Sequence, residues 1–170
     1  RRGRRDSAQM APAYAAGFRS LEDERRGVDL DVEGRLPGWL DGSLIRNGPA
    51  RFEIGGERVA HWFDGLAMLR GFALRDGDVA YTNRFLRSRE YLAASEDGRM
   101  AHDRFGTTRG VLAALRGLLL PSSTDNANVS VVRIDGRFVA ITETPVGIEF
   151  DPVTLETVGR FRFDGLDGQT

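Results

Sequence analysis

The fold is decided by residues 66–86, which read LAMLRGFALRDGDVAYTNRFL. Two runs rich in apolar and β-prone residues flank the dipeptide Asp76-Gly77. An Asp-Gly pair between two such runs is a strong signal for a two-residue hairpin turn, because both turn positions require a positive φ. The sequence therefore predicts an antiparallel hairpin with strands over residues 66–74 and 79–86.

The same pattern recurs twice further along the chain. One run turns at Asp135-Gly136 and a second turns at Asp151-Pro152. The predicted strands on either side of these turns are 129–134 with 138–142, and 147–150 with 157–163. Hairpins that follow one another without intervening helices are typical of β-propellers and β-sandwiches. From about Leu36 onward, the chain is predicted to be mostly β.

Residues 110–120, GVLAALRGLLL, are the exception to the β pattern and are followed by Pro121. Ala and Leu favour helix, and β-branched residues are nearly absent, so a short helix is predicted. Two interpretations of its apolar face remain open. The helix packs on the sheet, or it lies in a membrane interface with Arg109 and Arg116 near the head groups.

Composition excludes some function classes. The 170 residues carry 24 basic and 25 acidic side chains, and this balance provides no field to attract nucleic acid. There is no cysteine, so any metal must be held by His, Asp or Glu. This composition fits a cytoplasmic protein.

The two ends of the chain resemble cuts in a longer protein. The chain begins at Arg1, and it stops at Asp167–Thr170 without a closing element. Residues 1–20 carry no secretory-type apolar run and are expected to be a flexible tail. No apolar stretch approaches the roughly 20 residues of a transmembrane helix. Residues 21–170 are predicted to be the N-terminal part of one truncated domain.

Several motifs follow one another in a fixed order. An opening block in two parts reads LPGWLDGSLIRNGP over residues 36–49 and HWFDGLAML over residues 61–69. The later blocks are Asn83–Leu86, Asn126–Val129, Thr142–Pro145 and Glu149–Thr157. In this order, and over about residues 30–170, they closely resemble the carotenoid cleavage oxygenases. The sequence after Asp64-Gly65, residues 66–69, is more similar to the branch of β-carotene oxygenases and the retinoid isomerohydrolase of the eye than to the plant epoxycarotenoid branch.

The resemblance implies a seven-bladed β-propeller with one Fe(II) held on its axis by four histidines. It implies cleavage of a conjugated double bond of a carotenoid or apocarotenoid by O2, giving aldehyde or ketone products. The partners would be an apolar polyene and O2. At roughly 40–50 residues per blade, the chain would build the first three or four blades. The predicted fold class is all-β, a partial propeller with one short apolar helical segment.

His61 and His102 are the only histidines, too few for a four-histidine site, so this chain alone is expected to hold no metal and to be inactive. Their spacing from Asp64 and Asp103 does not match the alternation that places two ligands on one face of a strand. The resemblance assigns the histidine of the His61 block no ligand role. We therefore predict a hydrogen-bonded structural role for His61 at the start of a strand, and turn roles for Asp64 and Gly65. The first iron ligand is expected shortly after Thr170.

Glu143 is the most informative candidate residue. It follows the strand predicted over residues 138–142, and from the residues alone it is either an exposed strand-end glutamate or a carboxylate aimed inward. The resemblance implies a carboxylate that accepts a hydrogen bond from an iron-ligating imidazole, which fixes the ring and raises its basicity. We adopt that role as the prediction. Thr142 is predicted either to line the substrate tunnel or simply to favour the strand.

The remaining site predictions concern apolar contacts. Phe105 precedes the apolar segment and is either a core residue or part of the tunnel wall. The resemblance places residues 111–120 at the position where family members have an apolar patch that enters the membrane, which favours the interfacial interpretation. The predicted membrane-facing residues are Val111, Leu112, Leu115, Leu118 and Leu119. Residues 46–49, Asn126 and Asn128 are family markers expected to serve turns and strand registration.

The leading functional hypothesis is Fe(II)-dependent cleavage of a polyene by the full-length protein. A stilbene-cleaving oxygenase with the same machinery is one alternative. A metal-free propeller fragment that binds an apolar ligand or a protein is another.

Overall fold

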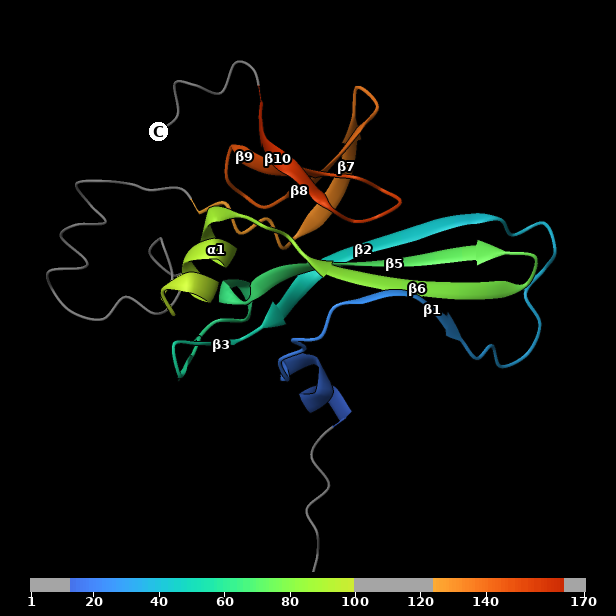
Figure 1. The fold of residues 1–170 in the computed structure, drawn as a ribbon, viewed down its shortest axis with the longest axis horizontal. Helices are drawn as coiled ribbons and strands as arrows, with labels where there is room; N and C mark the ends of the chain where they lie inside the picture. The colour runs from blue at the N-terminus through green and yellow to red at the C-terminus, as the bar shows by residue number, and fades with distance from the viewer. Residues whose placement is uncertain (1–12, 100–123, 164–170) are drawn as a thin grey trace, which may run out of the picture.

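The computed structural model describes residues 13–99 and 124–163, and these form two four-stranded antiparallel sheets (Figure 1). The first sheet contains β1 (Arg25–Leu30), β2 (Gly42–Arg51), β5 (Leu66–Arg75) and β6 (Asp78–Phe85), in the order β1-β6-β5-β2. At the β5–β6 turn, Asp76 and Gly77 both have positive φ, 53° and 93°. These angles fit the two-residue turn that the Asp-Gly pair predicts, and the hairpin is confirmed.

The second sheet is built from the predicted hairpins of the C-terminal part. It contains β7 (Ser130–Ile134), β8 (Arg137–Ile141), β9 (Val146–Phe150) and β10 (Thr157–Arg162), in the order β10-β9-β8-β7. Asp135 and Gly136 have φ of 49° and 81° and repeat the first turn. Both hairpins predicted here are confirmed.

Short elements fill the connections. They are the 3-10 helices η1 (Ala13–Phe18) and η2 (Trp62–Asp64), the ribbon of β3 (Glu53–Ile54) and β4 (Glu57–Arg58), and helix α1 (Arg89–Glu96). The expectation that hairpins follow one another without helices is wrong at α1. The signal was local, because Ser88 is an N-cap whose hydroxyl accepts from the backbone N–H of Tyr91 at 3.2 Å.

Strand β5 serves two hydrophobic cores. Leu66 and Met68 pack with Phe52, Phe85 and neighbours on one face. On the other face, Ala67 and Leu69 pack with residues of the second sheet. This explains why residues 66–69 are apolar without alternation, since all four are at most 2% exposed. The second core holds the two sheets together, and β2 and β7 contact each other at the junction.

Other expectations concern the extent of the fold. The described residues contain two sheets with the four strands of a blade, fewer than the three or four blades expected from length. Within the expected tail of residues 1–20, η1 is formed and the Ser20 hydroxyl accepts from the N–H of Phe52 at 2.8 Å. The tail's flexibility stays a prediction. The apolar helix predicted over residues 110–120 lies outside the described residues. No helix within the described ranges is long and apolar enough to cross a membrane.

Candidate functional site

The turn that carries Glu143 connects β8 to β9 over residues 142–145. Strand β8 ends at Ile141, one residue earlier than predicted, so both Thr142 and Glu143 belong to the turn. Glu143 is exposed and Thr142 is half-buried. Within the described part of the chain, the Glu143 carboxylate has no hydrogen-bond or ion-pair partner. It is therefore an acceptor open to a group outside that part.

The turn is tied to another segment by Thr144. Its hydroxyl donates to the carbonyl oxygen of Thr124 at 3.0 Å, across 20 positions of sequence. Thr124 begins the segment of residues 124–128, which runs into β7 and whose members from Asp125 to Asn128 are buried. We call residues 124–128 the brace segment.

Asp125 of the brace segment closes the start of α1. The first backbone N–H groups of a helix have no partner within the helix. The fully buried Asp125 carboxylate accepts from the N–H of Arg89 at 3.1 Å and of Glu90 at 3.2 Å. A negative charge here also complements the positive end of the helix dipole. The Arg160 Nε lies 3.7 Å from the same carboxylate and brings in β10.

Asn126 and Asn128 of the brace segment hold the chain before β5. The Asn126 side chain accepts from the N–H of Ala67 at 2.9 Å and donates to the carbonyl of Gly65 at 2.9 Å. The Asn128 amide donates to the carbonyls of Phe63 at 2.7 Å and Gly65 at 2.9 Å. Buried backbone groups require such partners, so these side chains are structural and join distant segments. Their predicted role in turns and registration is too local.

Asn47 completes the link to the first sheet. From β2, its amide donates to the carbonyl of Ala127 at 2.6 Å and of Ser130 at 3.1 Å. The brace segment thereby contacts β2, β5, η2 and α1. These partners lie 35 to 80 positions away in sequence from the brace segment, and no local pattern indicates them.

His61 and Gly65 flank η2. His61 is the N-cap, and its Nδ1 accepts from the N–H of Phe63 at 3.2 Å, which confirms the predicted hydrogen bond. The predicted position at a strand start is wrong, because His61 caps the start of η2. Gly65 is required for close packing, because an added Cβ would lie 2.7 Å from the Phe52 ring and 2.8 Å from Pro49. Asp64 lies in η2, 4% exposed, rather than at a simple surface turn.

The described residues do not assemble a metal site. Residues 13–99 and 124–163 contain no group of three or more His, Asp or Glu side chains placed to hold an ion. His102 lies outside those ranges, as do the predicted tunnel residue Phe105 and the predicted membrane-facing set. That set is Val111, Leu112, Leu115, Leu118 and Leu119. In the turn of residues 142–145, the exposed carboxylate is that of Glu143.

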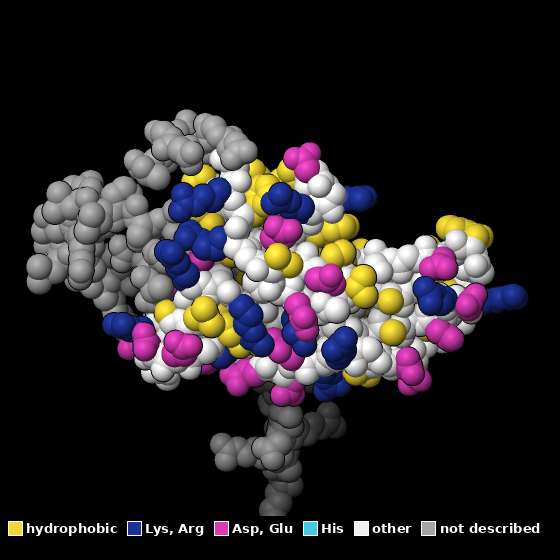
Figure 2. Space-filling model, turned by 45° about the horizontal axis from the view of Figure 1, so that its top comes forward, with side chains coloured by type: hydrophobic (Ala, Val, Ile, Leu, Met, Phe, Trp, Pro, Cys, Tyr) yellow, Lys and Arg dark blue, Asp and Glu magenta, His cyan; other side chains and the backbone are white. Residues whose placement is uncertain are grey.

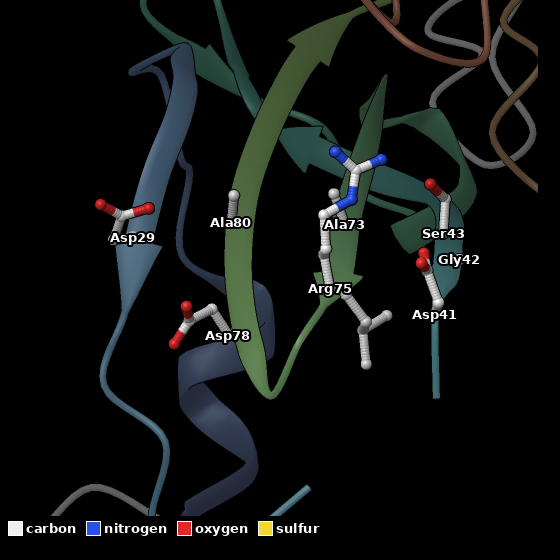
Figure 3. Close-up of a pocket in the computed structure, with 9 residues that line it drawn as sticks. Asp29, Asp41, Gly42, Ser43, Ala73, Arg75, Asp78 and Ala80 are labelled. Atoms are coloured by element: carbon white, nitrogen blue, oxygen red, sulfur yellow. The ribbon is translucent and has the colours of Figure 1, made fainter. Parts of the chain in front are cut away.

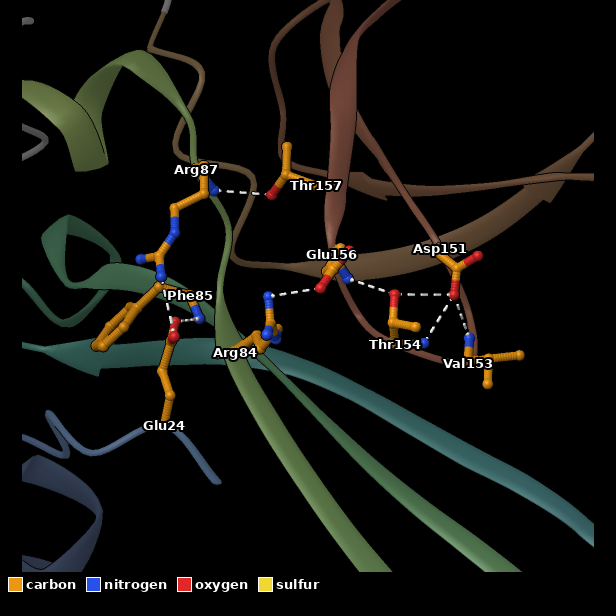
Figure 4. A network of polar contacts seen from close by, with 9 residues as sticks. All are labelled: Glu24, Arg84, Phe85, Arg87, Asp151, Val153, Thr154, Glu156 and Thr157. Atoms are coloured by element: carbon orange, nitrogen blue, oxygen red, sulfur yellow. Dashed lines mark hydrogen bonds and ion pairs between the residues drawn. The ribbon is translucent and has the colours of Figure 1, made fainter. Parts of the chain in front are cut away.

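Charged contacts fix the second sheet against the first. Arg84 on β6 pairs with Glu156 at 3.2 Å, and the N–H of Arg87 donates to the Thr157 hydroxyl at 2.9 Å (Figure 4). Arg87 also pairs with Glu24 at 2.9 Å. Exposed ion pairs of this kind contribute at most about 1 kcal/mol each, so the apolar core and the brace segment dominate the junction.

Asp151, in the β9–β10 connection, has a carboxylate that its own turn satisfies. One oxygen accepts from the N–H of Thr154 at 2.7 Å, the N–H of Val153 at 2.9 Å and the Thr154 hydroxyl at 3.1 Å (Figure 4). The N–H groups of Thr154 and Val153, followed by the Thr154 hydroxyl, hold the pKa of Asp151 below its usual range. This carboxylate is structural.

Two surface hollows lie on the first sheet, away from the Glu143 turn. The larger, of about 410 Å³, lies near the β5–β6 turn and is lined by Asp29, Asp41, Asp78 and Arg75 among others (Figure 3). The smaller, of about 180 Å³, lies between that sheet and residues 152–155. Neither is lined by Thr142 or Glu143. The charged lining of the larger hollow is unlike the apolar wall that a polyene requires.

Basic and acidic side chains are interspersed on the face of the molecule shown in Figure 2. This distribution matches the near-zero net charge.

Comparison with known proteins gives a consistent result. The family model described as retinal pigment epithelial membrane protein matches residues 18–170. The chain is 36% identical to β,β-carotene 15,15'-dioxygenase of Mus musculus in an alignment 146 positions long, which covers 81% of this chain and 26% of the relative. It is 35% identical to the mitochondrial carotenoid-cleaving dioxygenase of Pongo abelii in an alignment 173 positions long, which covers 94% of this chain and 31% of the relative.

Solved structures show the same similarity. A single-residue variant of the Synechocystis apocarotenoid oxygenase superposes with a TM-score of 0.77 at 28% identity, covering 90% of this chain and 32% of that one. A cobalt-substituted form of the Synechocystis enzyme gives 0.76 at 28% identity, covering 86% and 31%. The chain thus spans between about a quarter and a third of the length of these proteins.

Proposed function

Because this chain belongs to the retinal pigment epithelial membrane protein family of carotenoid cleavage oxygenases, we propose that its protein cleaves a conjugated double bond of a carotenoid or apocarotenoid with O2. The products are aldehydes or ketones. The proposal is carried by the family match over residues 18–170, which includes both sheets. The relatives and solved structures are named as dioxygenases and oxygenases of such substrates, which supports it.

Fe(II) is the metal that we propose, held by histidines outside the described residues. When bound, it would supply the activation of O2. The contribution of the described residues is the Glu143 carboxylate, which we propose accepts a hydrogen bond from the N–H of a metal-ligating imidazole. Such a bond fixes the ring orientation and raises its basicity. The exposed, unpartnered carboxylate on an anchored turn supports this role.

The test of the function uses the protein expressed from its whole reading frame. Loaded with Fe(II) and given a carotenoid or apocarotenoid under ¹⁸O₂, it is expected to release carbonyl products that carry the label. Removal of the metal with a chelator is expected to abolish cleavage, and Fe(II) to restore it. Stoichiometric iron with no cleavage of any polyene would contradict the proposal.

We further propose that the protein collects its apolar substrate at a membrane surface through the set from Val111 to Leu119. Thr142 and Phe105 would line the path to the site. In the whole protein, Leu115→Asp with Leu119→Asp is expected to weaken liposome binding about tenfold or more, because charge enters an interfacial apolar face. Co-sedimentation with vesicles measures this. A loss of several kcal/mol in stability with unchanged liposome binding would instead indicate a buried helix.

A further inference from the structure

We propose that Thr144 is a positioning residue whose hydroxyl, bonded to the carbonyl of Thr124, sets the direction of the Glu143 carboxylate. The inference rests on the proposed role of Glu143. It adds a residue that contacts neither metal nor substrate and acts only through its neighbour.

The hydroxyl of Thr144 selects a partner outside its own hairpin. It lies 3.0 Å from the carbonyl oxygen of Thr124 and 3.5 Å from that of Val146. A hydroxyl has one hydrogen to donate, and the shorter contact is the better bond. The turn is therefore attached to the brace segment and not merely closed on itself.

The accepting carbonyl is itself held in place. The Thr124 hydroxyl accepts from the N–H of Asn126 at 3.1 Å, which shapes the start of the brace segment. The next residue, Asp125, is fully buried and bonded to α1, and Asn126 is bonded to both Ala67 and Gly65. Thr144 is thus fastened to a segment that side-chain hydrogen bonds connect to the first sheet and to α1, and that an ion pair between Asp125 and Arg160 connects to β10 of the second sheet.

Proline restricts the turn from the other side. Pro145 has a fixed φ, and the residue before a proline is pushed toward extended backbone. Val146 and Gly147, which follow, are buried in the second sheet. With Thr144 held by its side chain and by the ring of Pro145, the peptide that joins it to Glu143 has little freedom.

No other contact of the described residues holds the carboxylate. Within that part of the chain, neither Thr142 nor Glu143 makes a side-chain hydrogen bond. A side chain that must meet an imidazole gains from a fixed starting point, because less conformational entropy is lost when the bond forms. Thr144 is the described residue best placed to provide that point.

The first experiment compares Thr144→Val with Thr144→Ser in the whole protein. Valine keeps the shape and removes the hydroxyl, while serine keeps the hydroxyl. Thr144→Val is expected to lower iron per chain and cleavage rate about tenfold, the low end for loss of an outer hydrogen-bond partner, and Thr144→Ser to restore both. Thr154→Val is the matched control, because Thr154 makes the equivalent turn bond to Asp151. It is expected to leave iron content unchanged.

The second experiment places Thr144→Val in a Glu143→Gln background. If Thr144 acts through Glu143, the second substitution is expected to lower iron content no further than Glu143→Gln alone. An equal further loss in the double variant would overturn the inference, and so would a normal Thr144→Val beside an impaired Glu143→Gln, which leaves the role of Glu143 standing. A Glu143→Gln protein with wild-type iron and turnover would overturn both.

Discussion

Two of the three turns of the second sheet, β8–β9 and β9–β10, differ in how their carboxylates are bonded. Asp151 is bonded to two backbone N–H groups and a hydroxyl of its own turn, so its charge is used within the fold. Glu143 has no partner in the described residues, and its neighbour Thr144 holds the turn instead. A turn that is anchored by a different residue leaves its carboxylate available for an outside group. The contrast separates a structural acid from a candidate functional one.

The largest expected effect comes from removing the brace on which this contrast depends. Asn126→Ala leaves the buried N–H of Ala67 without its partner and the carbonyl of Gly65 with only the bond from Asn128. We expect a loss of about 2 kcal/mol in unfolding free energy, because a buried polar group without a partner costs about 1–3 kcal/mol. Urea denaturation of the whole protein measures it. Asn126→Asp keeps the acceptor toward Ala67 but loses the donor and adds a negative charge at a buried position, so it is expected to destabilise the protein at least as much. A change below about 0.5 kcal/mol in the unfolding free energy of the alanine variant would show that the brace segment does not stabilise the fold through Asn126.

The next effect acts on function rather than on stability. Glu143→Gln keeps the shape and an acceptor oxygen but loses the charge that orients and activates an imidazole. In the whole protein, we expect a 10–100-fold fall in iron occupancy or cleavage rate with an unchanged melting temperature. Iron per chain and product formation are measured under identical iron supply. Glu156→Gln, which neutralises an exposed acid of the same sheet, serves as the control. Wild-type iron occupancy and cleavage rate for Glu143→Gln would show that the Glu143 carboxylate, like that of Asp151, has no role in metal binding.

The smallest effect is expected at Asp151 and depends on pH. The pKa of this carboxyl is lowered in the folded protein, so its stabilisation is complete above the ordinary value of 3.8 and is lost as pH falls through the lower folded value. Asp151→Asn is expected to flatten that part of the acid-unfolding curve and to leave iron content at neutral pH unchanged. Melting temperatures between about pH 2 and pH 5 test it. An unaltered acid limb would show that the turn does not depend on the charge.

The sequence predicted the hairpins because their signals are local. Asp76-Gly77 and Asp135-Gly136 set the turn backbone by themselves, and residues on either side need only to be apolar and β-prone. Strand β1 was not identified, since all its residues are exposed and its pairing with β6 is interrupted by a bulge between Arg25 and Val28. Helix α1 was missed although Ser88 is a local signal for its start. The second acceptor at this end of the helix, Asp125, lies 36 positions away from Arg89 and gives no local signal.

The candidate site was predictable only in part. The resemblance singled out Glu143, and the sequence alone indicated a strand ending near it. The roles of Asn47, Asn126 and Asn128 could not be derived, because each bonds to backbone groups 59 to 83 positions away. The link from Thr144 to Thr124 crosses a shorter gap, but no pattern distinguishes its hydroxyl from those of Thr142 or Thr154. The type of a side chain predicts whether it can form a hydrogen bond, but its partner depends on which segments the fold brings together.

The span of these brace contacts also bears on how the protein reaches its native state. The hairpins at Asp76-Gly77 and Asp135-Gly136 close over two residues, whereas the bonds from Asn126 to Gly65 and from Asn128 to Phe63 close loops of 61 and 65 positions. Contacts of long sequence separation carry a larger closure entropy and slow folding. The strands are therefore expected to pair before residues 124–128 dock, and the Glu143 turn gains its anchor only afterwards. Metal capture would then follow folding of this region rather than guide it.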